Sequence, residues 1–437
     1  MRYLARQMDP TGSSSGRDGS SDGSTQVQFV GTSDSQPLRV SRVVVGPDRH
    51  PGPTDDENDV RSSADEPRPT HLRSLTSLRF FAAVLVVVFH LSIYMPGVPT
   101  LGRLAAGGYV GVTFFFVLSG FVLTYSWDSG ATATQFFRRR FARVYPVHLL
   151  FIAVAMLPLS SPYWPALPAN LLLLQSWSPD DAVVRSFSSV SWSLSCEFFF
   201  YASFPLLVPW VLRVRRPLAT AAALVAAALA LGVALQMRGA DWGLLLFHLP
   251  AFRIVEFACG ALTAAALLRG WVPRLRVLWA GSWTVASYLL VLLLPIAIGY
   301  RVEDRWAFTL AMVPSFMALI AACARVDREG APSPLQGRTL VSLGQWSFCI
   351  YMAHPAVIAL TLPLLGSRSV PAAVLGCVLV VLAVIGVSYL LYTTFERPLE
   401  RWLRGRAHNR VSDEVATTSN DSVPAVAPPL PDVIVTD

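Results

Sequence analysis

Apolar runs of about 20 residues recur through the middle of this chain, separated by short polar stretches that are rich in arginine. A helix of that length crosses the ~30 Å hydrocarbon core of a bilayer and satisfies its own backbone hydrogen bonds there. The pattern therefore predicts about ten transmembrane helices. Their expected bounds are roughly 75–95, 108–127, 144–160, 190–212, 218–236, 245–268, 277–299, 306–324, 342–364 and 371–394. The third is the weakest, because it is short and ends in a proline-rich stretch.

Composition supports an integral membrane protein. Of the 437 residues, 53% are hydrophobic and only 14% are charged, whereas about a quarter of a soluble protein is charged. All 35 basic residues are arginine, which indicates a GC-rich coding sequence more than a chemical need. The net charge of +7 therefore says little about partners, and we expect no nucleic acid among them. The predicted fold class is an all-α polytopic membrane protein, a bundle of about ten transmembrane helices.

Polar segments flank the apolar region at both ends. Residues 1–70 are rich in Ser, Gly, Asp and Arg and contain no apolar run, so they lack the core of a signal peptide. We expect a disordered cytoplasmic N-terminal tail at 1–70, a transmembrane domain at 71–404 and a second disordered cytoplasmic tail at 405–437.

The distribution of arginine predicts the orientation in the membrane. With the N-terminus in the cytoplasm, the short inner loops hold 13 arginines and the outer loops hold 6. Cytoplasmic loops of membrane proteins carry an excess of basic residues. Both termini are therefore expected to be cytoplasmic.

The first apolar run carries an ionisable group at each end, Arg79 and His90. Eleven steps of about 100° bring the two side chains back to nearly the same face, roughly 16 Å apart along the helix. A charge inside a membrane is costly and is a functional-site hypothesis by default. Arg79 could instead be a topology signal that reaches back to the headgroups, and His90 could simply bond a neighbouring helix.

A second anomaly is Glu197, in a span where Ser193, Glu197 and Tyr201 follow at four-residue steps and share a face. The carboxylate could take part in chemistry or could buttress an arginine from another helix.

Two further groups of polar residues lie in later spans. Arg253 and Glu256 are three residues apart and can pair within their helix, which favours a structural role. His354 follows Tyr351 by three residues and precedes Pro355, which would loosen the helix. A packing role for this histidine is at least as consistent with the sequence as a catalytic one.

The stretch "FFRRRFARVYP" places Arg140 and Arg143 three residues apart, ahead of Pro146 and His148. Topology alone would explain the cluster, but arginine also binds phosphate well through bidentate hydrogen bonds. A phosphorylated cytoplasmic cosubstrate is one hypothesis. The five cysteines fall within expected spans without metal-ligand spacing, so we expect no metal site.

Seven stretches together resemble a known family. They are "LTSLRFFAAVLVVVFH", "GYVGVTFFFVLSGFVLTYS", "FRRRFARVYPVHLL", "SWSLSCEFFFYASFPLL", "FRIVEFACG", "LGQWSFCIYMAHPAV" and "TTFERPLERW". In order and spacing the chain is similar, from about 73 to 400, to the membrane-bound acyltransferase family 3, which includes O-antigen, polysaccharide and macrolide O-acyltransferases. We expect the stand-alone form, without a fused extracytoplasmic domain.

Three motifs of that family fall on residues already singled out. The arginine–ten residues–histidine motif matches Arg79 and His90, and the arginine–two residues–arginine motif matches Arg140 and Arg143. The tryptophan-serine-leucine motif that ends in glutamate runs from Trp192 to Glu197. Two positions depart from the usual pattern. Phe198 stands where a polar residue is usual, and Ser347-Phe348 stands where Ser-Tyr is usual; each could alter the acceptor pocket.

The resemblance implies transfer of a short acyl group, with acetyl as the first expectation, from acyl-CoA to a hydroxyl group. His90 would act as general base or as a transient acyl carrier, and Glu197 would orient its imidazole. Arg140 and Arg143 would hold the phosphates of the coenzyme, with Arg79 at the mouth of the groove. Acyl-CoA would be a cosubstrate, and no tightly bound cofactor is expected.

The resemblance also implies an acceptor that is a glycan, a lipid-linked sugar or a macrolide, and a multi-pass protein of the bacterial cytoplasmic membrane in contact with lipid. The alternative is a transporter or exporter without acyl-transfer chemistry. Transporters often show two halves related by an internal repeat, and no such symmetry is seen in this sequence.

Depths estimated from helical rise predict a site in two layers. His90, Glu197, Arg253 and His354 reach a similar level just outward of the midplane. Arg79, Arg140, Arg143 and His148 form a second layer near the inner face. We expect a basic inner mouth for the coenzyme and a deeper polar chamber for the chemistry, with Ser193, Tyr201, Glu256 and Tyr351 as supporting residues.

Overall fold

The computed structural model describes residues 72–94, 102, 104–128, 130, 132–157, 162–239, 241–298, 304–365 and 370–403. These residues form a bundle of helices, with no strand among them. The tails expected at 1–70 and 405–437 lie outside the described residues.

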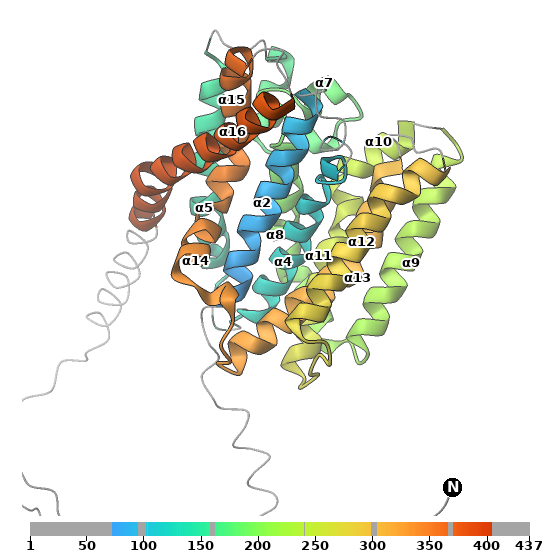
Figure 1. The fold of residues 1–437 in the computed structure, drawn as a ribbon. Coiled ribbons are helices and arrows are strands. Elements are labelled where there is room, and N and C mark those ends of the chain that lie inside the picture. Colours follow the sequence, from blue (N-terminus) through green and yellow to red (C-terminus); the bar gives the residue numbers. More distant parts are fainter. Residues whose placement is uncertain are drawn as a thin grey trace, which may run out of the picture. The chain divides into compact units, whose positions relative to one another are not determined.

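Long helices make up most of the bundle. They are α2 (Arg73–Tyr94), α4 (Val110–Tyr125), α5 (Ala133–Ala155), α8 (Trp192–Arg213), α9 (Pro217–Gln236), α11 (Pro250–Leu268), α12 (Val277–Ile298), α13 (Arg305–Arg328), α15 (Ser347–Leu365) and α16 (Val370–Leu391). A π-helical turn, η6 (Tyr392–Glu396), continues α16. In Figure 1, α2 and α4 lie in the middle, α9, α12 and α13 to one side, and α5, α15 and α16 to the other.

Short helices complete the described chain. Between α5 and α8 lie η2 (Trp164–Ala166), α6 (Leu167–Leu171), η3 (Gln175–Trp177) and α7 (Asp181–Val184). The others are α10 (Asp241–His248), before α11, and η5 (Pro334–Gln336) and α14 (Arg338–Gln345), before α15.

Seven described helices are long and apolar enough to cross a membrane, namely α2, α8, α9, α11, α12, α13 and the continuous helix that contains α16. The pair α14 and α15 gives an eighth if it counts as one span, but it bends by 60° at Trp346. Helix α4 has only 16 residues, and α5 begins at Ala133 and carries four arginines. The all-α polytopic class is therefore supported, while the expected number of about ten spans is not confirmed.

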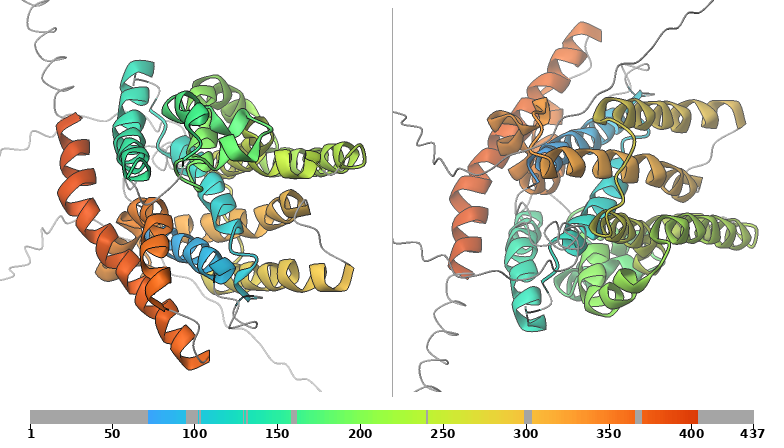
Figure 2. Two further views of the ribbon diagram at one scale, coloured as in Figure 1. Left: turned by 90° about the horizontal axis from the view of Figure 1, so that it is seen from above. Right: turned by 90° about the horizontal axis from the view of Figure 1, so that it is seen from below.

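The tightest crossing in the interior joins α4 and α11. A Cβ atom added at Gly120 would lie 1.9 Å from the carbonyl oxygen of Phe257, and one added at Gly260 would lie 1.8 Å from that of Val117. The two backbones are thus in direct contact, as is common where small residues face each other in membrane helices. In the views along the bundle, α4 passes through its interior (Figure 2).

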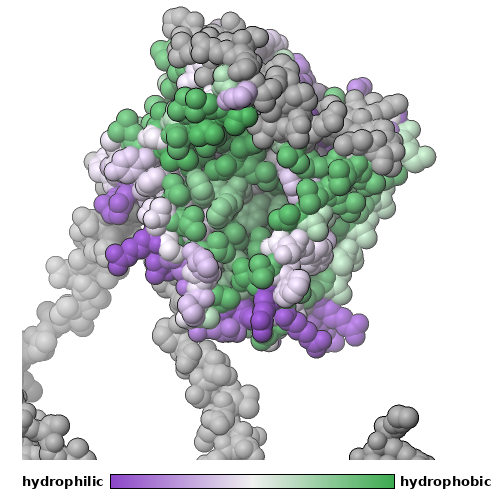
Figure 3. All heavy atoms as spheres, in the orientation of Figure 1, coloured by the Kyte–Doolittle hydropathy of each residue, from purple (hydrophilic) through white to green (hydrophobic). Residues whose placement is uncertain are grey.

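Arginines at one end of the bundle bind backbone carbonyl groups at the end of α11 and in the loop that follows it. Arg328 donates to the carbonyl of Leu267 at 3.3 Å, and Arg325 donates to that of Pro273 at 2.9 Å. Cations at helix C-termini satisfy carbonyls that have no partner within the helix. Figure 3 shows hydrophilic residues along the lower edge of one face, below a broad hydrophobic band. Arg325 and Arg328 therefore hold the end of α11 and the loop that follows it in place.

The α4–α11 crossing generates a stability prediction. Replacing Gly260 with alanine puts a methyl group where the Val117 carbonyl stands, so the helices must separate. We expect a loss of about 1–3 kcal/mol, typical of overpacking, seen as a lower melting temperature of the detergent-extracted protein. Gly386→Ala is the matched control, because an added Cβ there meets nothing within 4 Å. Equal melting temperatures for the two variants would contradict the assigned crossing.

Candidate functional site

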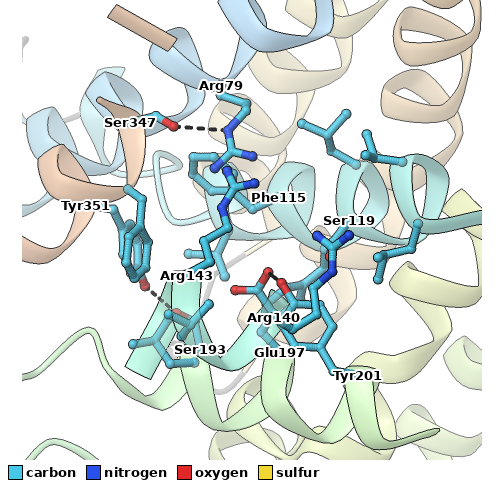
Figure 4. Close-up of a pocket in the computed structure, with 18 residues that line it drawn as sticks. Arg79, Phe115, Ser119, Arg140, Arg143, Ser193, Glu197, Tyr201, Ser347 and Tyr351 are labelled. Atoms are coloured by element: carbon cyan, nitrogen blue, oxygen red, sulfur yellow. Dashed lines mark hydrogen bonds between the residues drawn. The ribbon is translucent and has the colours of Figure 1, made fainter. Parts of the chain in front are cut away.

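A cavity of about 780 Å³, counted out to its open mouth, lies among α2, α4, α5, α8 and α15. Its polar lining contains three arginines, one carboxylate and five hydroxyl groups (Figure 4). These residues are Arg79, Ser119, Arg140, Arg143, Ser193, Glu197, Tyr201, Ser347 and Tyr351. We call this the arginine pocket. All three arginines expected to bind the coenzyme lie in it.

Arg79 is turned into the bundle. Its Nε donates to the hydroxyl of Ser347 on α15 at 3.1 Å, and its guanidinium lies 5.9 Å from the ring centre of Phe115 on α4. Figure 4 shows the side chain directed at the pocket. A residue that served only as a topology signal would extend to the headgroups, so this geometry favours a role inside the protein.

Arg140 and Arg143 lie one turn apart on α5, whose start is fixed by a capping box between Thr132 and Gln135. The Arg140 guanidinium stacks near the ring of Tyr201 at 6.0 Å. Within the described part of the chain, the Arg143 guanidinium forms no hydrogen bond or ion pair. Arg143 is half-buried. A cation removed from water without a hydrogen-bonded partner is costly, so the pocket is suited to an anion that supplies one.

Helix α8 contributes Ser193, Glu197 and Tyr201 to the pocket, as their four-residue spacing predicted. The Tyr201 hydroxyl donates to Glu197, and Ser193 shares a 2.8 Å hydrogen bond with the hydroxyl of Tyr351. Tyr351 in turn donates to the carbonyl of Val190 at 2.9 Å. These bonds hold one face of α8 against α15.

Glu197 lies with the arginines, not with His90. It is close enough to Arg79 and Arg143 to interact with both electrostatically, and its only hydrogen bond within the described chain is from Tyr201. His90 does not line the arginine pocket. These contacts favour the buttressing alternative for Glu197, and a deeper chamber shared with His90 stays a prediction.

The start of α8 is covered by another part of the chain. The depth estimate assumed that the span containing Glu197 starts at the membrane boundary. The segment 162–191 instead folds over the start of α8, where Ser191 is fully buried and Trp192 nearly so, so this helix begins inside the protein.

His90 belongs to a pair of histidines that joins α2 to α15. Nε2 of His354 lies 3.2 Å from Nδ1 of His90, and Nδ1 of His90 also lies 2.9 Å from the carbonyl oxygen of Val86. Nδ1 of His354 lies 3.3 Å from the carbonyl oxygen of Ile350. His354 is fully buried, whereas His90 is half-buried.

The hydrogen-bond network assigns the tautomers of this pair. A carbonyl oxygen only accepts, so Nδ1 carries the hydrogen in both rings. Nε2 of His354 is then an acceptor for the Nδ1–H of His90. Nε2 of His90 is left with a lone pair and has no hydrogen-bond partner in the described chain. This atom can accept a proton.

Helix α15 links the histidine pair to the arginine pocket. Ser347, Tyr351 and His354 follow at steps of four and three residues on one face, and they bond Arg79, Ser193 and His90 respectively. The rings of Tyr351 and His354 are 5.9 Å apart. The bond of Ser347 to Arg79 was not predicted from the sequence, although the four-residue spacing of Ser347 from Tyr351 could have indicated that they share a face.

Arg253 and Glu256 form a separate cluster outside the arginine pocket. They make a fully buried ion pair at 3.1 Å, and Arg253 also donates to Thr113 at 3.2 Å and Thr309 at 2.9 Å. The predicted pairing within one helix is confirmed. These contacts tie α11 to α4 and α13, the helices that pack around the glycine crossing.

His148 likewise lies outside the pocket. It is fully buried, and its Nε2 lies 2.8 Å from the carbonyl oxygen of Asn170, in the segment that covers the start of α8. In the part of the chain that the structure describes, no group of three or more His, Cys, Asp or Glu side chains could hold a metal ion.

Comparisons with known proteins place most of the chain in one family. The model of an acyltransferase domain, acyltransferase family 3, matches residues 72–393. The acyltransferase MdmB of Streptomyces mycarofaciens is 34% identical over 394 residues, which covers 80% of this chain and 97% of that protein. The exopolysaccharide production protein ExoZ of Rhizobium meliloti is 28% identical, covering 69% of this chain and 91% of its own.

A more distant relative is the O-acetyltransferase OatA of Staphylococcus aureus, which is 28% identical over 170 residues, or 34% of this chain and 26% of that protein. No solved structure matches the chain. The matched region contains the whole arginine pocket and both histidines of the pair. Because the family model and the relatives match most of its length, the chain belongs to acyltransferase family 3.

Proposed function

We propose that the protein transfers a short acyl group, acetyl in the simplest case, from acyl-CoA to a hydroxyl group of a macrolide, a glycan or a lipid-linked sugar. The observation that carries this proposal is the pocket of Arg79, Arg140 and Arg143, which α15 joins to a histidine with a free acceptor nitrogen. The names of the relatives, an acyltransferase and an exopolysaccharide production protein, support this class of reaction and acceptor.

The charge of the pocket supports a phosphorylated donor. Three guanidinium groups line it and Glu197 is the one carboxylate in that lining, so an excess of positive charge faces the cavity. Guanidinium groups bind phosphate through paired hydrogen bonds. In this proposal the coenzyme phosphates bind Arg140 and Arg143 from the cytoplasmic side. The acyl arm then runs past Arg79 toward His90, a rise of about 16 Å along α2.

The histidine pair supports general-base chemistry. Nε2 of His90 takes the proton from the acceptor hydroxyl as its oxygen attacks the thioester carbonyl. The C–S bond then breaks, and the proton passes from His90 to the thiolate, which leaves as coenzyme A. His354 keeps Nδ1 of His90 protonated and so holds Nε2 as the base. Glu197 takes no part in this proton transfer and instead balances the charge of the arginines in the pocket.

Removing the base tests this chemistry. His90→Asn retains an N–H near the position of Nδ1 and loses Nε2, so the contact with His354 can persist. We expect a fall in transfer of about 10²–10⁴-fold, typical of a lost general base. The measurement is incorporation of radiolabel from acetyl-CoA into membrane-extracted acceptor, at matched protein level.

Two outcomes would count against the proposed acyl transfer with His90 as its base. Near-parental activity of His90→Asn would leave His90 as a packing residue. A parent protein that binds the acceptor but transfers no label would favour transport without acyl-transfer chemistry.

Arg140→Ala and Arg143→Ala test the donor site separately. Each removes a charge-assisted contact worth roughly 1.5–3 kcal/mol, so the dissociation constant of acetyl-CoA should rise about 10–100-fold in calorimetry of purified protein. Arg139→Ala is the matched control, since this arginine lies in the same cluster on α5 but is exposed. Equal weakening by all three substitutions would show a general charge effect and remove the pocket from donor binding.

A further inference from the structure

Helix α16 contains one irregular turn, the π-helical turn Tyr392–Glu396. Such turns add one residue to a helix and occur often at functional sites. Upstream, Val380, Val384 and Ser388 lie on the buried face. In a regular α-helix that face would next contain residue 395, at about 100° per residue. The added residue gives the buried place to Glu396, which is 5% exposed, while the following Arg397 is exposed.

The π-turn places this carboxylate directly behind the arginine pocket. Cys349 on α15 donates its thiol to Oε2 of Glu396 at 2.9 Å. Cys349 lies two residues after Ser347, which binds Arg79. Phe395 packs against the hydrophobic cluster that includes Val144, the residue next to Arg143. Glu396 thus lies between α5 and α15, and it is not among the residues that line the pocket.

Both arginines that face Glu396 interact with it electrostatically. Glu396 acts on Arg143 together with Tyr201, Glu400 and Glu197, and it also acts on Arg79. None of these carboxylates comes within 4 Å of an Arg79 or Arg143 nitrogen in the described chain. The negative charge therefore stabilises the two cations without occupying the N–H groups that would bind a ligand. In a protein interior such a charge acts over several ångströms with little screening.

We propose that Glu396 is a positioning residue for the donor site, a fixed counter-charge that the π-turn holds behind Arg79 and Arg143. It differs from Glu197, which lies in the pocket and is bonded by Tyr201. The proposal rests on the proposed function, because it assumes that the pocket binds the phosphates of coenzyme A.

The test uses the full chain, purified in detergent, with coenzyme A itself as the probe. Glu396→Gln keeps the size of the side chain and an acceptor for the Cys349 thiol, but removes the charge. We expect the dissociation constant of coenzyme A to rise about tenfold. Glu396→Asp, which restores the charge, should recover most of the affinity. Cys349→Ala should bind like the parent, since the carboxylate remains.

Glu400→Gln is the comparison variant, because Glu400 lies one turn further along the same helix and also acts on Arg143. A smaller effect than that of Glu396→Gln supports the buried position as the cause. An equal effect overturns the proposal, and so does unchanged affinity in Glu396→Gln. A purely structural role would lower the melting temperature of Glu396→Gln and leave the affinity of its folded fraction unchanged, which also overturns it.

The parent protein separates this proposal from the one on which it rests. If the parent does not bind coenzyme A at all, the proposed function fails at the donor. If the parent binds it and Glu396→Gln binds it equally well, only the role of Glu396 fails.

Discussion

The cost of placing charge inside a membrane protein governs this structure. A buried guanidinium must find a counter-charge and acceptors within the protein, because neither water nor lipid supplies them. The chain meets this requirement in two ways. Arg253 pairs with Glu256 and donates to Thr113 and Thr309, and it fixes the crossing of three helices. Arg143 has neighbouring negative charge but no direct acceptor in the described chain. Arg253 therefore has a structural role, whereas the N–H groups of Arg143 can bind a ligand.

Helices α2 and α15 set the geometry between the two parts of the site. They are joined at two levels, by Arg79 with Ser347 and by His90 with His354. Eleven residues separate the two levels on α2, and seven separate them on α15. The bend of 60° between α14 and α15 starts the latter helix at Ser347, beside Arg79. Helix α14 also packs closely on α2 just before this point, since a Cβ atom added at Gly344 would lie 1.9 Å from the carbonyl oxygen of Thr76.

Relations within one helix could be predicted from the sequence, but only some relations between helices could. The grouping of Arg79, Arg140 and Arg143 was predicted, and the path of the segment that covers α8 was not. Rise and twist are fixed, so the shared faces of Ser193, Glu197 and Tyr201 and the pairing of Arg253 with Glu256 followed directly from spacing. The level of Glu197 depended on where α8 begins, and the covering segment 162–191 has no periodicity that reveals its path. The bend at Trp346 interrupts an apolar run that reads as one span. Glu396 was missed because a single added residue in α16 changes which side chain faces inward, and hydropathy does not register such a change.

The partner of His90 shapes the chemistry that the site can perform. A carboxylate partner would stabilise the imidazolium by a full charge, whereas His354 offers only a lone pair and the Val86 carbonyl only a dipole. These two contacts supply no full negative charge to His90. In the proposed reaction, a thiolate leaving group needs the proton that His90 has taken up. A base that holds it briefly suits a transfer in which the hydroxyl of one substrate is deprotonated and the sulfur of the other is protonated at the same nitrogen. Glu197 lies among the arginines and balances charge in the arginine pocket. In the proposed reaction, this placement leaves the histidine free to return the proton.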